Sequence, residues 1–200
     1  AHRMTVSPSR LLAALAAVSL LAAGTWYALS RQASQDQVPA ITPATFVGSD
    51  RCADCHAAQA GAWRASQHAL AMQQAADGTV LGDFDDASFS HAGVTTTFFR
   101  RDGKPFVRTD GPGGELADFE VKYTFGVAPL QQYLVELPGG RLQALSIAWD
   151  SRPVDSGGQR WFHLYPGEQV DHRDELHWTR PAQNWNFMCA DCHSTDVRKG

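Results

Sequence analysis

The pentapeptide CADCH occurs twice, at residues 52–56 and 189–193, and the two copies contain all the cysteines of the chain. In each copy a histidine directly follows the second cysteine, which is the pattern for covalent attachment of a c-type haem. Two thiols three positions apart on a helical turn share one face, so both can reach one edge of a porphyrin. The adjoining imidazole can then bind the iron as its proximal ligand. The repeat therefore predicts at least two covalently attached haems c.

The predicted attachment residues are Cys52, Cys55 and His56 at the first site and Cys189, Cys192 and His193 at the second. Paired cysteines also form disulfides or structural zinc sites, but neither use explains a histidine after both pairs. Zinc ribbons separate their cysteine pairs by about 15–20 residues, far fewer than separate the two copies here. Haem attachment is thus the interpretation that uses every residue of the motif.

The sixth position on each iron needs a further ligand, and His68 is the first candidate. It lies in WRASQHALAMQ, a proline-free stretch that predicts a helix continuing from the first motif. At 1.5 Å per residue, such a helix would place His68 about 18 Å from His56, too far for both to bind one iron. We therefore expect His68 to ligate a neighbouring haem. It could ligate the haem of the first motif only if Gly61 breaks the helix and the chain folds back. Met72 could replace it and would raise the reduction potential, although a packing role is the simpler interpretation.

Two further histidines are candidate distal ligands. His177 precedes the second motif, and Pro181 interrupts any helix between them, so a loop could bring both imidazoles to one iron. His91 stands at the start of a strand-like run. By contrast, His163 alternates with aromatic residues as a packing residue would, and His172 lies in an acidic, surface-like loop.

The N-terminus carries an uncharged apolar run at residues 11–29, with arginines on both sides. Its length approaches the thickness of a bilayer, so we expect residues 1–29 to be a signal-anchor or signal peptide. Basic residues ahead of the run favour a cytoplasmic N-terminus and an exported remainder. We favour an uncleaved anchor that tethers the chain to the periplasmic side of a bacterial cytoplasmic membrane.

The middle of the chain has strand patterns. Asp102-Gly103 between two β-rich runs is a strong hairpin signal. Residues 118–125 alternate apolar with polar side chains, as a half-buried strand does. Further runs at 131–137, 141–149 and 160–165 are separated by glycine-rich turns. An antiparallel meander is the simplest arrangement of these runs.

These patterns predict an α+β chain in which helical, loop-rich multihaem cytochrome c modules flank the β-meander, after an N-terminal transmembrane or signal helix. The predicted segments are the membrane segment at 1–29, a linker at 30–45, a first haem module at 46–80, a β-rich insert at 81–165 and a second haem module at 166–200. Because little protein follows His193, we expect the natural protein to continue beyond this chain.

Composition narrows the range of partners. The formal net charge is −4, and no basic patch points to nucleic acid. We expect a redox protein as the partner, and the acidic clusters are most simply solvated loops.

From Phe46 to Lys199 the chain resembles the large cytochrome c554-like multihaem proteins of bacteria, in particular those that continue into tetratricopeptide repeats. The stretches that carry this resemblance are FVGSDRCADCH, WRASQHALAMQ, VLGDFDDASFSHAG, YTFGVAPLQQYLVELPGGRLQALSIAWDSR, RWFHLYP, LHWT and NWNFMCADCHST. It implies haems with two histidine ligands, with His68 and either His177 or His91 in the distal positions. It also implies further haem motifs or repeats C-terminal to this chain.

Two haem sites without a recognisable catalytic group favour a periplasmic electron carrier over an enzyme. The alternative is a multihaem oxidoreductase acting on a small inorganic nitrogen or sulfur compound, which would need one iron with an open face. A haem-bearing interaction or sensor module is a third possibility.

Overall fold

The computed structural model describes residues 8–35 and 44–197, with side chains for 18–31 and 44–197. The chain divides into two compact units, residues 1–46 and 47–200. In the first unit, helix α1 (Pro8–Gln35) runs through much of the predicted N-terminal segment and into the predicted linker. Residues 36–43 of that linker, and residues 1–7, lie outside the described part of the chain.

Within the described residues, no helix combines the length and the apolar character that crossing a membrane requires. The transmembrane helix of the expected fold is therefore not found there.

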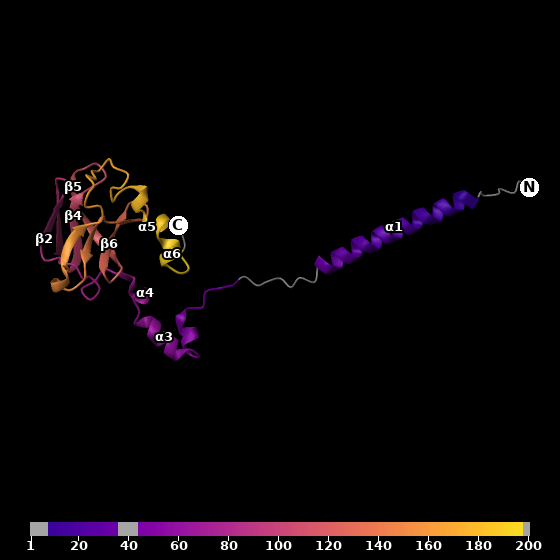
Figure 1. The fold of residues 1–200 in the computed structure, drawn as a ribbon, viewed down its shortest axis with the longest axis horizontal. Coiled ribbons are helices and arrows are strands. Elements are labelled where there is room, and N and C mark those ends of the chain that lie inside the picture. Colours follow the sequence, from indigo (N-terminus) through magenta and orange to yellow (C-terminus); the bar gives the residue numbers. More distant parts are fainter. Residues whose placement is uncertain (1–7, 36–43, 198–200) are drawn as a thin grey trace, which may run out of the picture. The chain divides into compact units, whose positions relative to one another are not determined.

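The second unit is built on a curled antiparallel sheet (Figure 1). Hydrogen-bonded neighbours follow the order β2-β3-β4-β5-β6-β8-β9, with β1 added beside β5 and β7 beside β6. The strands are β1 (Met72–Gln74), β2 (Ala87–His91), β3 (Val94–Arg101), β4 (Lys104–Asp110), β5 (Leu116–Phe125), β6 (Leu130–Leu137), β7 (Arg141–Ala144), β8 (Ile147–Asp150) and β9 (Arg160–His163). Because sequential strands pair, most of the sheet is a meander.

Two hairpins at the start of the meander have two-residue turns. The predicted turn at Asp102-Gly103 is confirmed, with φ of 51° and 74°, and Arg101 pairs with Lys104 across it. Ala92-Gly93 makes a second such turn between β2 and β3, with φ of 47° and 81°. Positive φ at both central residues gives the turn a twist that matches the twist of the strands.

The first and last strands of the sheet order come together, so the sheet nearly closes. The rings of His91 on β2 and His163 on β9 stack with centroids 3.9 Å apart. Inside, Trp161 of β9 stacks on Phe98 of β3 at 3.5 Å and meets the edge of Phe84 at 5.6 Å. Aromatic packing across the interior therefore holds together strands that share no hydrogen bonds.

A connecting segment before β2 closes one side of this core. The backbone N–H of Leu81 donates to Gln131 Oε1 at 2.8 Å, and that of Gly82 donates to the Tyr133 hydroxyl at 2.9 Å. A Cβ at position 82 would lie 2.5 Å from the same hydroxyl and 2.7 Å from the Trp161 ring, so only glycine fits there. Residues 81 and 82 are thus held against the aromatic core by two hydrogen bonds and by close packing.

Short helices lie at both ends of the unit's sequence. Before the sheet come α2 (Ser49–Ala53), α3 (Ala57–Arg64) and α4 (Gln67–Leu70). After it come α5 (Trp185–Met188) and α6 (Ala190–His193). Two 3-10 turns lie at Val154–Ser156 and Pro181–Gln183.

A second buried cluster attaches the C-terminal helices to the sheet. Trp185 of α5 and Ala190 of α6 pack with Leu134 and Ala144 of the sheet, and Met72 and Cys189 lie against the same cluster. An isolated bridge also pairs Gln143 with Asn184. The second cysteine motif is therefore held against the face formed by β6 and β7.

The expected fold class was wrong, because the unit is a nearly closed antiparallel sheet rather than helical haem modules flanking a β-meander. The stretch that we expected to be one helix after the first motif ends at Arg64, restarts at the cap Ser66 and becomes strand β1 at Met72. Alanine-rich composition favours helix, but pairing with β5 outweighs that preference. The predicted strand at 141–149 is likewise divided into β7 and β8, both paired with β6.

Trp161→Ala should lower the free energy of unfolding by about 3–5 kcal/mol, the usual cost of removing a large buried aromatic side chain. Trp161 is 7% exposed and contacts the aromatic rings of several strands. The measurement is urea unfolding followed by circular dichroism.

Phe162→Ala is the matched control, because Phe162 is the next residue on β9 and is only partly buried. An equal loss in both variants would contradict the assignment of Trp161 to the centre of the core.

Candidate functional site

The first CADCH motif lies on the surface between two short helices. Cys52 is on α2, Cys55 follows it, and His56 is the N-cap residue of α3. The His56 backbone N–H donates to the Cys52 carbonyl at 2.9 Å, which closes a helical turn around the motif. Both thiols are free and exposed.

The second motif repeats this turn. The His193 backbone N–H donates to the Cys189 carbonyl at 3.1 Å. Upstream, Asn184 caps α5 by accepting a hydrogen bond from the Phe187 backbone N–H at 3.2 Å. The His193 ring meets the Phe125 ring edge-on at 5.0 Å. Both motifs therefore present two thiols and one imidazole from a single helical turn.

The thiols of the second motif differ in environment. Cys192 is exposed, whereas Cys189 is partly covered by the second buried cluster. Burial, and to a smaller extent the neighbouring Cys192, raises the pKa of the Cys189 thiol. Cys189 consequently keeps its proton to higher pH than an ordinary cysteine.

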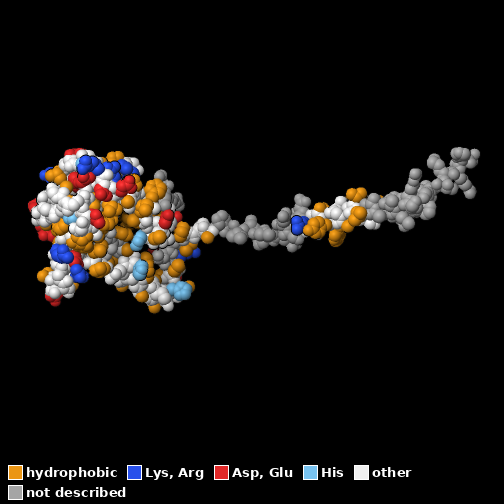
Figure 2. Space-filling view, turned by 45° about the horizontal axis from the view of Figure 1, so that its top comes forward, with side chains coloured by type: hydrophobic (Ala, Val, Ile, Leu, Met, Phe, Trp, Pro, Cys, Tyr) orange, Lys and Arg blue, Asp and Glu red, His pale blue; other side chains and the backbone are white. Residues whose placement is uncertain are grey.

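Apolar side chains lie uncovered beside both motifs. A hollow at the first motif is lined by Cys52 and His56 together with Ala60 and Trp63, and Trp63 is 49% exposed. At the second motif, Phe187 and Met188 are 64% and 63% exposed. Figure 2 shows apolar and histidine side chains together on one face of this unit. These exposed apolar side chains are available for contact with a ligand or partner.

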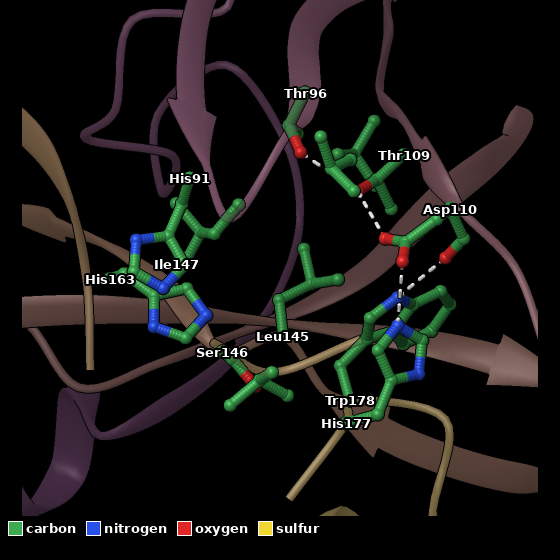
Figure 3. A pocket seen from close by; sticks show the side chains of 13 residues that line it. His91, Thr96, Thr109, Asp110, Leu145, Ser146, Ile147, His163, His177 and Trp178 are labelled. Atoms are coloured by element: carbon green, nitrogen blue, oxygen red, sulfur yellow. Dashed lines mark hydrogen bonds and ion pairs between the residues drawn. The ribbon is translucent and has the colours of Figure 1, made fainter. Parts of the chain in front are cut away.

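The structure separates His68 from the other two candidate distal ligands. His68 is exposed on α4. In contrast, His91 and His177 line one cavity of about 40 Å³ inside the sheet, together with His163 (Figure 3). None of the described residues that line this cavity belongs to either cysteine motif. The structure thus brings His91 and His177 together with each other rather than with His56 or His193.

His177 has hydrogen-bond partners at both ring nitrogens. Its Nδ1 accepts from the Thr179 backbone N–H at 3.4 Å and lies 2.8 Å from the Thr179 hydroxyl. Nε2 then carries the proton of the neutral ring and faces Asp110 Oδ2 at 3.0 Å. Iron ligation by His177, as predicted from the sequence, would require either the contacts of Nδ1 with Thr179 or the bond of Nε2 to Asp110 to break.

Asp110 is the centre of a buried polar network that the sequence analysis missed. Its Oδ1 accepts from the Thr109 hydroxyl at 3.2 Å, and its carbonyl accepts from Trp178 Nε1 at 2.8 Å (Figure 3). The Thr109 hydroxyl is also 2.8 Å from that of Thr96. An aspartate before Gly-Pro-Gly-Gly looks like a turn residue, so its burial had no signal in the sequence.

The other two histidines of the cavity are at the seam between the end strands. His91 Nε2 lies 2.9 Å from the Glu168 carbonyl, and His163 Nδ1 accepts from the Tyr165 backbone N–H at 3.1 Å. Burial, and then the neighbouring His91, lowers the pKa of His163. The buried Ser146 hydroxyl lines the same cavity and has no hydrogen-bond partner among the described residues.

One family model matches the chain, described as cytochrome c554 and c-prime, over residues 51–82. The match contains the first CADCH, α3, His68 and β1, and it ends before the second motif. It indicates a c-type cytochrome with haem c. No curated protein and no solved structure matches the chain.

The residues of the first motif fit this cofactor. Cys52 and Cys55 are free to form thioethers, His56 follows them in the same turn, and the exposed Trp63 ring lines the adjoining hollow. The second motif has the same turn and the same kind of uncovered apolar neighbours, although it lies outside the matched residues. Its local structure therefore supports the same chemistry.

The free energy of unfolding should fall as the pH is lowered from 7.5 to 5.5. The pKa of His163 is below its ordinary value of about 6.5 in the folded state, so the unfolded chain binds more protons in this range and is favoured. Asp118 and Glu120 have lowered pKa values, and their stabilisation is lost only at more acidic pH. Urea unfolding at several pH values measures the slope.

His163→Gln should reduce this slope, whereas Phe162→Ala, which removes no titratable group, should leave it unchanged. An unaltered slope in His163→Gln would show that protonation of His163 does not oppose folding.

Asp110→Ala should lower the free energy of unfolding by roughly 2–4 kcal/mol, because His177 Nε2 and the Thr109 hydroxyl lose a buried acceptor. Asp77→Ala is the control, since Asp77 is 84% exposed in its pair with Arg100 and should have little effect. Thermal unfolding of both variants makes the comparison. Equal stability of the two would refute a structural role for the network.

Proposed function

We propose that this chain is an electron-transferring c-type cytochrome that carries haem c at both CADCH motifs. The observation that supports this most directly is the repeated local structure. At two places far apart in the sequence, two thiols and an imidazole come from one helical turn closed by the same backbone hydrogen bond. Neither a disulfide nor a zinc site would need the histidine in that turn.

The residues of each motif would have distinct roles. Cys52 and Cys55 would hold the haem covalently and His56 would bind its iron; Cys189, Cys192 and His193 would do the same at the second motif. When bound, the haem supplies an iron that changes between its ferric and ferrous states. The protein would tune the potential of that iron through the ligands it supplies and through the apolar side chains beside each motif.

The exposure of the motifs favours electron exchange with another protein. Cys52, Cys55, Cys192 and His193 are all exposed, so the attached haem edges would lie at the surface. A partner could therefore approach each edge without a conformational change. We propose a redox protein as this partner and a location outside the cytoplasm, where the thioether bonds of c-type cytochromes are made.

The test is the number of haems per chain. The protein is expressed as an exported chain in a bacterial host with a cytochrome c maturation system, next to a known c-type cytochrome as a maturation control. The pyridine haemochrome assay and intact mass should give two haems per chain. Cys52→Ala/Cys55→Ala and Cys189→Ala/Cys192→Ala should each leave one.

A colourless product with four free thiols, from cells that mature the control cytochrome, would refute the proposal. Loss of haem in only the first double variant would restrict the proposal to the motif that the family model matches.

A further inference from the structure

Helices α2 and α3 run back alongside each other on either side of the first motif. The last residue of α3, Arg64, donates through Nη2 to Oδ1 of Asp50, near the start of α2, at 3.0 Å. This bond joins the beginning of one helix to the end of the next, so the chain reverses direction between them. His56, the N-cap residue of α3, lies at the reversal, and Arg64 lies at the open end of the helix pair.

One face of α3 lines the hollow at the first motif. The helix continues through Gly61, which therefore does not provide the break that would let the chain fold back there. Residues three and four positions apart in such a helix share a face. In α3 that face supplies Gln59, Ala60, Trp63 and Arg64 to the hollow.

Arg64 gives this hollow a permanent positive charge. Among the described residues that line it there is no aspartate or glutamate, and Arg64 is the only lysine or arginine. A haem would bring negative charge in its two propionate carboxylates, which lie on the part of the ring away from the thioether positions. His56 is at one end of the hollow, and α3 rises about 12 Å over its 8 residues to Arg64. The cation therefore stands at the end where the carboxylates are expected.

The bond to Asp50 leaves the guanidinium of Arg64 available for a second partner. The side chains of Arg64 and Asp50 are 53% and 98% exposed, and an ion pair as open as this one contributes little to stability. Only Nη2 of the guanidinium takes part in it, and an arginine side chain has five N–H donors in a planar fork. Asp50 can thus hold the side chain in place while donors remain for another carboxylate.

From this placement we infer that Arg64 binds a propionate carboxylate of the haem held by Cys52, Cys55 and His56. The inference rests on the proposed function and adds a charged contact to the first haem site. The guanidinium donates two N–H groups to the two carboxylate oxygens, an arrangement that arginine favours, and no covalent bond forms or breaks. Such a contact stabilises the ionised carboxylate, and its positive charge beside the ring favours ferrous over ferric iron.

The experiment uses the matured protein with Cys189→Ala/Cys192→Ala, which keeps only the first haem, and measures its reduction potential by spectroelectrochemistry between pH 5 and pH 9. Arg64→Gln should lower the potential, because a positive charge beside the haem is lost. Reduction of the iron raises the pKa of a nearby carboxyl, so the potential falls with pH while the propionate titrates. Without Arg64 the pKa of the propionate rises, and this fall should move to higher pH.

Arg51→Gln is the matched control and should leave the pH of the fall unchanged. Arg51 lies on α2, is exposed and does not line the hollow, but its replacement removes the same charge. A long-range loss of charge would lower the potential in both variants without moving the pH of the fall. Arg64→Lys keeps the charge but not the planar fork, so it should restore part of both shifts.

Equal effects of Arg64→Gln and Arg51→Gln, or a pH profile that Arg64→Gln leaves unchanged, would overturn the assignment of Arg64. Haem content and far-ultraviolet circular dichroism show whether each variant is matured and folded. If Arg64→Gln lost its haem, retention in Arg64→Lys would support the contact, and loss in both would show that Arg64 serves the folding of the motif instead. All of these results leave the proposed function standing, whereas a parent without haem would refute the proposed function itself.

Discussion

The antiparallel pairing of β1 with β5 is the contact on which the arrangement of the cysteine motifs depends. Strand β5 also pairs with β4 and β6, so it is fixed on both sides by the sheet. Its last residue, Phe125, pairs with Met72, and the Phe125 ring meets the ring of His193 edge-on. A three-residue strand therefore joins the segment after the first motif to the site of the second. Through this pairing the segment that contains α2, α3 and α4 is hydrogen-bonded to the sheet.

The parts of the structure that the sequence predicted are those that local chemistry decides. A cysteine pair at i and i+3 with an adjoining histidine shares one helical turn wherever the chain places it. The turn at Asp102-Gly103 likewise follows from the left-handed conformation that a two-residue hairpin requires. In both cases the residues that determine the geometry are neighbours in the sequence. Their prediction needed no knowledge of the fold.

The features that local sequence could not predict depend instead on partners far away in the sequence. The alanine-rich stretch around Met72 has every local sign of a helix, and only its register against Phe125 makes it a strand. His177 looked available for iron, but Asp110, its hydrogen-bond partner, lies 67 positions away. His91 bonds to a carbonyl 77 positions away. Histidine serves equally as a ligand, an ion-pair partner and a packing residue, so its type alone could not separate these roles.

The two motifs differ in how firmly the rest of the protein holds them in place. Helices α2 and α3 contain no buried residue, whereas α5 and α6 bury Trp185 and Ala190 against the sheet. Local stability follows buried contacts, so the sheet holds the second motif in shape while the first depends on its own short helices. Covering Trp63 with a porphyrin would give the first motif the apolar contact that it lacks. The sheet therefore supports the second motif rigidly, and a haem at the first motif, as proposed, would supply the burial that its helices lack.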